Sequence, residues 1–188
     1  MDRNLGAVRA GTAYNDSQAY GDLFQWGRPD DLHQDRHSGT TITLSNIDKP
    51  GHSNFIYGMG SPYDWRSPQN NNLWQGVFGI NNPCPLGWRI PTAGEWRTEI
   101  NSWDNTIEDY QERAFASPLK LTRTGLRPYI NPSYVDLYPY KNQEDYWSST
   151  VSGSNAKNLG VYGNVNAGSL GIASNSRAFG MAVRCIKN

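Results

Sequence analysis

The chain has 188 residues, of which 17 are basic and 17 acidic, so its formal net charge is zero. This length suits one domain with a sizeable core, and the lack of a basic excess argues against general nucleic-acid binding. No apolar run reaches the roughly 18 residues that a transmembrane helix needs. The sequence also contains 7 Trp and 11 Tyr, residues that disordered chains lack. We therefore expect a soluble, folded, loop-rich domain that does not insert into a membrane.

Residues 18–26 show the spacing of an amphipathic helix. Residues 15–17 are all suitable N-caps. Ala19, Leu23 and Trp26 then recur at intervals of three and four positions, which is typical of one helix face. The pattern predicts a first helix of about three turns.

A second helix is predicted after Pro91. Thr92 and Glu95 have the spacing of a capping box, in which each side chain bonds the other residue's backbone N–H. Trp96, Ile100 and Trp103 line one face. Whether the helix extends or a separate turn follows stays open for the apolar positions Ile107, Tyr110 and Phe115.

Two long tracts show no helical period, residues 38–83 and 117–145, and both are rich in Gly or Pro. Within the first, only residues 40–44 and 54–57 have the composition of strands. Long irregular connections in a compact domain are usually functional, or else their elements have been wrongly assigned. Both tracts carry aromatic residues that can pack them against the core.

The last forty residues alternate apolar with small or polar side chains, the period of a half-buried antiparallel sheet. Strands are predicted at residues 146–150, 159–162, 168–172 and 181–186. Two amphipathic helices and a small sheet indicate an α+β fold.

The chain contains two cysteines, Cys84 and Cys185. They allow a single disulfide, which would indicate an oxidising compartment. The alternative is a pair of buried free thiols. A zinc site is not expected, because neither cysteine has a second one nearby.

Five segments together resemble the Fibrobacter succinogenes major paralogous domain: residues 2–7, 19–28, 82–92, 146–149 and 180–187. The match covers nearly the whole chain in the family's order. The resemblance implies a single C-type lectin-like domain over residues 1–188, of the formylglycine-generating-enzyme branch. Such a domain has two helices on a twisted antiparallel sheet, adjacent chain ends and long surface loops. Family members usually have residues before the segment that matches Met1, so a first strand is expected to be missing or supplied differently.

Residues 147–188 also resemble the variable region of a diversity-generating retroelement protein, which uses the same scaffold. The non-core positions there are mostly residues that an Asn codon becomes when its adenines are replaced. Fixed positions would be Trp147, Leu159, Val161, Leu170, Arg177, Val183 and Cys185. The alternative is an unvarying sheet with polar turns.

Exposed Tyr, Asn and Ser on a rigid scaffold have the chemistry of a paratope. Within residues 147–188 the candidate ligand contacts are Ser152, Asn155, Lys157, Asn158, Tyr162, Asn164, Asn166, Ser169, Asn175, Ser176 and Phe179. Tyr162 and Phe179 would be the anchors, because few residues carry most of an interface's energy.

Catalytic and metal motifs are weak. Formylglycine-generating relatives work through a cysteine pair, but Cys185 is the one cysteine of the last segment, so no enzyme activity and no cofactor are expected. His33 and His37 have a helical metal spacing without the Glu of a zinc-hydrolase motif, so a polar loop is the preferred interpretation. The adjacent pairs 108–109 and 144–145 are interpreted as solvated carboxylates. A structural calcium stays open as an alternative with the oxygen ligands Asp64, Asp136, Glu144 and Asp145.

Three arginines, Arg89, Arg177 and Arg184, are interpreted as buried or half-buried structural groups paired with carboxylates or loop carbonyls. For the whole chain we expect a non-enzymatic recognition domain that binds a protein or glycan on another surface. The alternative is a fixed domain of a secreted or lipid-anchored bacterial surface protein with a structural or adhesive role. The expected location is extracellular, on a cell surface or a virion, although residues 1–4 lack the basic and apolar regions of a signal peptide.

Overall fold

A three-stranded antiparallel sheet forms the centre of the computed structural model, which describes residues 1–58, 60–137 and 140–188. The sheet has the order β5 (Glu144–Ser152), β6 (Asn155–Tyr162) and β7 (Ser169–Ser176). The remaining elements are η1 (Ser17–Ala19), β1 (Phe24–Gln25), β2 (Thr40–Thr41), β3 (Phe55–Ile56), β4 (Trp88–Arg89), α1 (Ala93–Asn101), α2 (Tyr110–Ala116), η2 (Pro132–Asp136), η3 (Tyr140–Asn142), β8 (Gly180–Met181) and β9 (Ile186–Lys187). Two α-helices and small, mostly antiparallel sheets confirm the α+β class.

The register of the sheet defines two faces. Asp145 of β5 lies opposite Gly160 of β6, which lies opposite Gly171 of β7. Because side chains alternate along a strand, the neighbouring residues Tyr146 and Leu159 point to the other side. We call the side of Tyr146 and Leu159 the helix face, and the side of Asp145, Gly160 and Gly171 the loop face.

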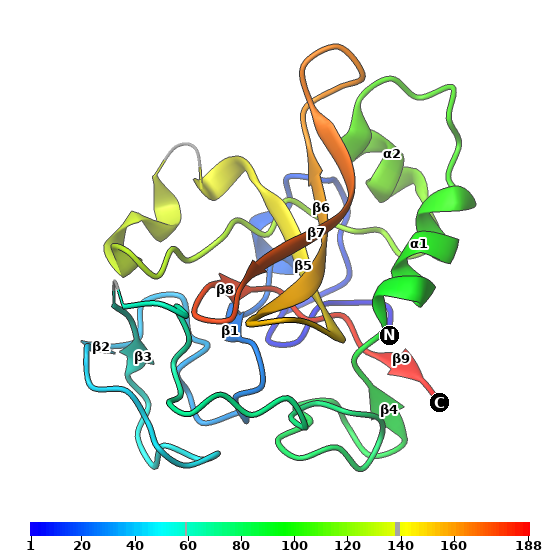
Figure 1. Ribbon diagram of the computed structural model, residues 1–188. Coiled ribbons are helices and arrows are strands. Elements are labelled where there is room, and N and C mark those ends of the chain that lie inside the picture. Colours follow the sequence, from blue (N-terminus) through cyan, green and yellow to red (C-terminus); the bar gives the residue numbers. More distant parts are fainter. Residues whose placement is uncertain (59, 138–139) are drawn as a thin grey trace.

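Both α-helices cover the helix face (Figure 1). The predicted capping box of α1 is confirmed: Thr92 accepts a hydrogen bond from the Glu95 N–H at 3.2 Å, and Glu95 accepts one from the Thr92 N–H at 2.7 Å. The Trp96 indole donates to the carbonyl of Trp147 at 3.1 Å, which fixes the helix to β5. Of the apolar positions left open after Trp103, Tyr110 and Phe115 lie in a separate helix, α2, with Asp109 as its N-cap, and Ile107 precedes it.

The helix predicted over residues 18–26 is wrong. Gly21 has a φ of +71°, and a Cβ there would lie 2.3 Å from the carbonyl oxygen of Leu5, so the chain turns at this point. Beyond it Leu23, Phe24 and Trp26 are all at most 1% exposed. An amphipathic helix needs a solvent face, and residues 23–26 have none. The chain therefore forms the short η1 before Gly21 and β1 after it.

The other predicted strands lie at the expected positions in the chain. They are shorter than expected, and they pair outside the central sheet. The segments at 40–44 and 54–57 form only the two-residue strands β2 and β3, which pair in parallel. The strand predicted at 181–186 divides into β8, paired with β1, and β9, paired with β4. Ala182 between them bonds β5, accepting from the Trp147 N–H at 3.0 Å and donating to the Asp145 carbonyl at 3.1 Å. Because both sides of this segment are buried, it is not a half-exposed strand.

Buried indoles hold the irregular tract 38–83 in place. Trp65 donates its indole N–H to the carbonyl of Trp26 at 2.7 Å, and Trp74 donates to Arg28 at 3.1 Å. Trp26 in turn donates to Ser148 of β5 at 2.9 Å. These rings bury large apolar surface while their one polar atom is satisfied, so the loops are part of the core. Residues 59, 138 and 139 of the two irregular tracts lie outside the described residues.

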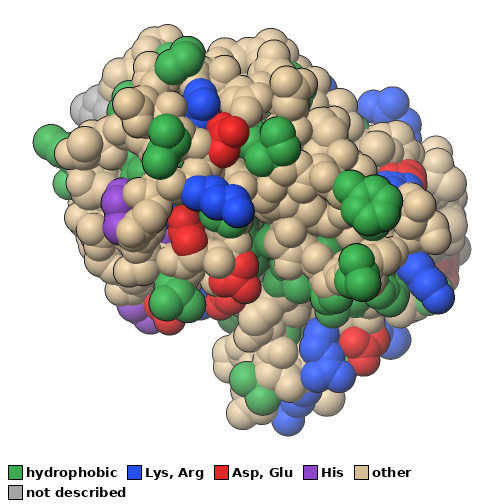
Figure 2. Space-filling view, turned by 90° about the horizontal axis from the view of Figure 1, so that it is seen from below, with side chains coloured by type: hydrophobic (Ala, Val, Ile, Leu, Met, Phe, Trp, Pro, Cys, Tyr) green, Lys and Arg blue, Asp and Glu red, His purple; other side chains and the backbone are tan. Residues whose placement is uncertain are grey.

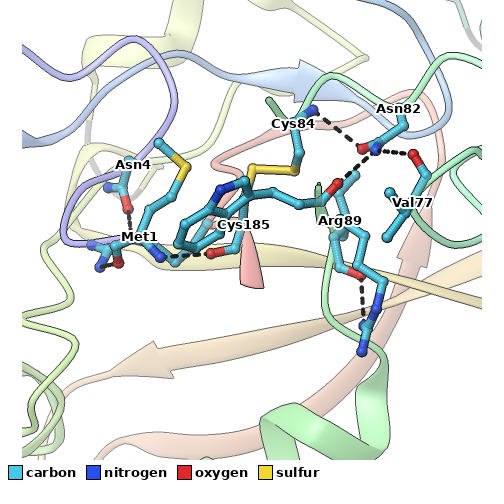
Figure 3. Close-up of a disulfide and its surroundings, with 10 residues drawn as sticks. Met1, Asn4, Val77, Asn82, Cys84, Arg89 and Cys185 are labelled. Atoms are coloured by element: carbon cyan, nitrogen blue, oxygen red, sulfur yellow. Dashed lines mark hydrogen bonds between the residues drawn. A yellow bond between two sulfur atoms is a disulfide. The ribbon is translucent and has the colours of Figure 1, made fainter. Parts of the chain in front are cut away.

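Cys84 and Cys185 form the disulfide that their number allowed, with Cα atoms 5.9 Å apart. The Met1 amine donates to the Cys185 carbonyl at 2.9 Å, so the N-terminus lies beside this bond (Figure 3). The two ends of the chain are adjacent (Figure 1). The disulfide therefore connects the end of the chain to the loop before β4.

The three arginines are structural, as expected. Arg89 bonds both carboxylate oxygens of Glu95, at 2.6 and 2.8 Å. Arg177, 1% exposed, donates to the carbonyl of Gly153 at 3.1 Å. Arg184, 3% exposed, donates to main-chain carbonyl oxygens of Met1 and Leu119. Each guanidinium joins segments that are distant in sequence or caps a neighbouring helix.

On the face shown in Figure 2, acidic and basic side chains are interspersed among uncharged ones. Within the described ranges, no helix is long and apolar enough to cross a membrane.

Candidate ligand-binding site

A hollow of about 540 Å³ lies on the loop face of the sheet, within the size range of small-molecule sites. Strands β5, β6 and β7 form its floor, and η3 with the following residue and Phe179 form its walls. Its lining residues are Leu126, Tyr140, Gln143, Asp145, Gly160, Tyr162, Ser169, Leu170, Gly171, Ile172, Ala173, Asn175 and Phe179.

The hollow exists because two glycines face each other at its floor. Gly160 and Gly171 are paired across β6 and β7, and neither has a positive φ. A Cβ on Gly171 would meet no heavy atom within 4 Å, and a Cβ on Gly160 would make only ordinary contacts, the nearest with Asp145 Oδ1 at 3.4 Å. The backbone therefore does not require glycine at either position. Their effect is to leave space where side chains would otherwise fill the sheet surface.

Asp145 stands beside Gly160 and is 9% exposed. Its Oδ1 accepts a hydrogen bond from Asn158 Nδ2 at 2.8 Å, and Asn158 Oδ1 accepts one from Asn175 Nδ2 at 2.9 Å. These bonds join all three strands across the floor. Burial raises the pKa of Asp145 to about 7, against the opposing effect of the Asn158 hydrogen bond. The carboxyl group can therefore gain or lose a proton near neutral pH.

Three aromatic rings line the hollow, those of Tyr140, Tyr162 and Phe179. Phe179 is held by an edge-to-face contact with Tyr129, with ring centroids 4.7 Å apart at 81°. Tyr162 is 48% exposed at the outer end of β6. Rings on a fixed sheet supply apolar contact area with little loss of side-chain entropy on binding.

Four of the eleven predicted contact residues are brought together here: Tyr162, Ser169, Asn175 and Phe179. Both predicted anchors are among them. These four come from β6, from β7 and from the turn that follows β7, so the sheet register assembles them.

The other exposed or half-exposed candidates lie elsewhere. Ser152 and Asn155 are paired beside the β5–β6 turn. Strand alternation places Lys157 on the helix face. Asn164 and Asn166 are in the β6–β7 turn, where the Asn164 side chain accepts hydrogen bonds from two backbone N–H groups.

Asn158 and Ser176 are not available to a ligand, which corrects their prediction as surface contacts. Asn158 is 0% exposed, because it lies on the central strand with its amide bonded to Asp145 and Asn175. Ser176 is 9% exposed and donates its hydroxyl hydrogen to the Tyr63 carbonyl at 2.6 Å. The tract 38–83 covers this end of β7. The alternating pattern of the strand does not show that a distant segment lies over it.

The interpretation of residues 144–145 as solvated carboxylates is also wrong. Glu144 is 0% exposed on the helix face, and burial raises its pKa well above the usual value. Asp145 occupies the loop face. The two carboxylates are adjacent in a strand and therefore point in opposite directions.

The oxygen ligands considered for calcium are dispersed. Asp64 accepts from Gln69 at 2.8 Å and lies 3.8 Å from Arg177, while Asp136 lies 3.5 Å from His37. Among the residues that the structure describes, no three His, Cys, Asp or Glu side chains group to hold a metal ion.

The two histidines with metal spacing also differ in their burial and in their hydrogen-bond partners. His33 is buried, with Nδ1 2.6 Å from Asp31 and Nε2 accepting from the Gln25 N–H. His37 is largely exposed beside Asp136. The segment is a polar loop held by side-chain hydrogen bonds.

Sequence reasoning missed Tyr140, Gln143 and both floor glycines. A signal for the glycines was present, since Gly160 and Gly171 each interrupt an apolar strand pattern. Tyr140 and Gln143 come from the irregular tract before β5, and no local pattern places that tract over the sheet.

Comparison of the chain with protein-family models, with curated proteins and with solved structures gave no match. The fold and the hollow thus define an α+β protein with a preformed, aromatic-lined and mainly uncharged ligand-sized site.

Proposed function

We propose that this chain is a non-enzymatic recognition domain that binds a protein or glycan on another surface. The observation that carries the proposal is the glycine-floored hollow, which gathers Tyr162, Ser169, Asn175 and Phe179. Aromatic rings with a few polar groups on a rigid floor suit reversible binding. Its surroundings are stabilised by the sheet, so the site is formed before a ligand arrives.

The proposal includes a C-type lectin-like fold of the formylglycine-generating-enzyme branch, as in the Fibrobacter succinogenes major paralogous domain. Support comes from two helices on one face of a small antiparallel sheet, adjacent chain ends and long packed loops. Residues 147–188 supply β6, β7 and Phe179, so diversification of this segment would alter the hollow directly. That placement favours a variable protein of a diversity-generating retroelement.

A binding role rather than catalysis is supported by the chemistry of the site. Both cysteines are in the disulfide, so neither is a free nucleophile. No His, Lys or Arg occurs among the described residues that line the hollow. The disulfide also fits an extracellular location.

A second candidate is a fixed surface domain with a structural or adhesive role. Asn158, Asn164 and Ser176 favour it, because each uses its side chain in hydrogen bonds that hold the sheet or its turns. Random replacement at these positions would disturb the scaffold.

Sequencing the codons for residues 147–188 across a natural population separates the two candidates. Substitutions at adenine positions of a near-duplicate template, with Trp147, Leu159 and Cys185 unchanged, are the expected result. An invariant segment without a template would establish the fixed surface domain.

Binding itself is tested with a Gly171→Val variant, which places a side chain in the hollow. Ser174→Val is the matched control, because it changes the same strand on the opposite, helix side at an exposed position. We expect wild type and control to bind the same members of a glycan array or displayed-peptide library, and Gly171→Val to lose them. Equal binding by all three proteins would contradict a ligand site in the hollow.

A further inference from the structure

Asp145 is the one acidic side chain among the described residues that line the hollow, and none of them is basic. Its Oδ1 accepts from Asn158, while its Oδ2 receives no hydrogen bond from the described part of the chain. A buried carboxylate with one bonded oxygen and no cation is costly, and a cation reaching the second oxygen would remove that cost.

Two other aspartates, one half-buried and one buried, have an arginine partner. Asp31 lies 2.8 Å from Arg28, and Asp64 lies 3.8 Å from Arg177. Glu144, on the helix face, is 0% exposed, and neither of its carboxylate oxygens has a hydrogen-bond partner in the described part of the chain. Asp145 differs from Asp31 and Asp64 in having no guanidinium partner, and it differs from Glu144 in lining an open hollow.

The walls of the hollow also suit a cation. The rings of Tyr140, Tyr162 and Phe179 present π-electron surfaces in the same space. A cation within about 6 Å of such a ring is attracted to its face, and more strongly where water is excluded. A neutral sugar would use the same rings but would have no need of an unpaired carboxylate.

We propose that the hollow binds the cationic end of a lysine or arginine side chain of a protein partner, with Asp145 as its counter-ion and the three rings around its stem. This inference rests on the proposed function and names the ligand class for the same site. The glycine floor provides the depth that a long side chain needs to reach Asp145.

The inference also predicts how the affinity for a cation depends on pH. Besides Asp145, the titratable residues in the described lining are Tyr162 of β6 and Tyr140 of η3, and β7 contributes none. A cation favours the ionised carboxylate and lowers its pKa from about 7. Binding therefore releases a proton, so affinity should rise with pH until about pH 7 and then level off.

The test is a titration followed by amide NMR shifts of Gly160 and Gly171. The cationic probes are the N-acetyl N-methylamides of lysine and arginine, at millimolar concentration. The uncharged control is the same derivative of norleucine, and methyl glycosides of common hexoses form a separate arm. The variants are Asp145→Asn, which keeps an oxygen to accept from Asn158, and Tyr162→Leu, which changes a half-exposed side chain.

We expect the cationic probes to shift both glycine signals and norleucine to leave them unchanged. Asp145→Asn should weaken binding by about tenfold or more, equal to about 1.4 kcal/mol, and should abolish the rise of affinity with pH. Tyr162→Leu should weaken binding without removing that pH dependence.

The inference is overturned if norleucine binds as well as lysine, if Asp145→Asn binds unchanged, or if the cations leave the glycine signals unmoved. A glycoside that shifts both glycines equally in wild type and Asp145→Asn would overturn it while leaving the hollow a ligand site. If the Gly171→Val comparison has also shown no loss of binding, the proposed function fails together with it.

Discussion

Asp145 shows how one residue's surroundings set both stability and binding. It is the second residue of β5, and the glycines on the same face of the sheet leave it beside a hollow. Burial makes its charged form costly, whereas the Asn158 and Asn175 amides hold its position. Ionisation of Asp145 therefore lowers the stability of the folded protein, and a positively charged ligand would offset that loss.

Replacing Asp145 with Asn should change how stability depends on pH. The folded-state pKa of about 7 lies above the unfolded value near 3.9, so the native state holds the proton longer. The free energy of unfolding should therefore fall as pH rises from about 4 to about 7. Asp145→Asn should remove this contribution, which at about 1.4 kcal/mol per pKa unit amounts to a few kcal/mol.

Urea unfolding at pH 5 and pH 8 measures the difference. Glu108→Gln is the control, because Glu108 is exposed and should leave the pH dependence nearly unchanged. An Asp145→Asn protein that loses stability with rising pH as steeply as wild type would contradict a raised pKa of Asp145 in the folded state.

Gly171→Val should keep or raise stability. Glycine within a strand costs about 0.5–1 kcal/mol in conformational entropy, and Gly171 has space for a Cβ and no positive φ. Gly163→Val provides the contrast, since Gly163 has a φ of +67° and its Cβ would lie 2.8 Å from Gly168. Thermal unfolding should show an unchanged or higher midpoint for the first variant and a lower one for the second. A large loss at Gly171 would mean that the hollow is not open.

Among the elements, α1 has a start that is encoded locally. Its capping box satisfies N–H groups at the N-terminus, and Arg89 adds two bonds to Glu95. These contacts lower the pKa of Glu95 to about 2, mainly through the hydrogen bond from Arg89. The β6–β7 turn is fixed differently, by the Tyr110 N–H donating to the Gly163 carbonyl. The β6–β7 turn is thus attached to α2.

Thr92→Ala should destabilise the protein by about 0.5–2 kcal/mol, the usual cost of losing an N-cap side chain. Chemical denaturation of wild type and variant measures this difference. Thr98→Ala serves as the control, because Thr98 is exposed within the same helix and alanine has the higher helix propensity. Equal stability of Thr92→Ala and wild type would show that the capping box does not contribute.

At the scale of the whole molecule, the disulfide and the buried indoles replace long secondary structure. Cys84 and Cys185 are 101 positions apart, and indole N–H groups connect the loops to the sheet. The strands outside the central sheet contain two residues each. Stability is therefore expected to depend on tertiary contacts more than on local propensity.

Reduction of the disulfide should lower the free energy of unfolding by about 4–5 kcal/mol under the loop-entropy model for a closed loop of this length. Guanidinium unfolding of the oxidised and reduced proteins measures the change. Thiol titration of the unfolded, unreduced chain is the control and should find no free thiol. Two titrated thiols would rule out the bond.

The sequence predicts some elements well because their signals are local. Thr92 and Glu95 are three residues apart, so the capping box needs no distant contact. Gly21 shows the reverse: the helical spacing around it was overridden by a close approach of Leu5, which local spacing does not reveal. Tyr162 and Phe179, predicted as anchors, both line the hollow, whereas Asn158 is buried, because it lies between two neighbouring strands.

The α+β class, the N-terminus of α1, the approximate places of the C-terminal strands and the option of a single disulfide could all be predicted from the sequence. These features follow from periodicity, capping chemistry and cysteine number, all of which act over a few residues or through composition. The position of Asp145 beside two glycines, and that of Tyr140 in the wall of the hollow, became evident from the folded chain. A site between strands and a distant loop depends on register and packing, which bring together residues that no local pattern connects.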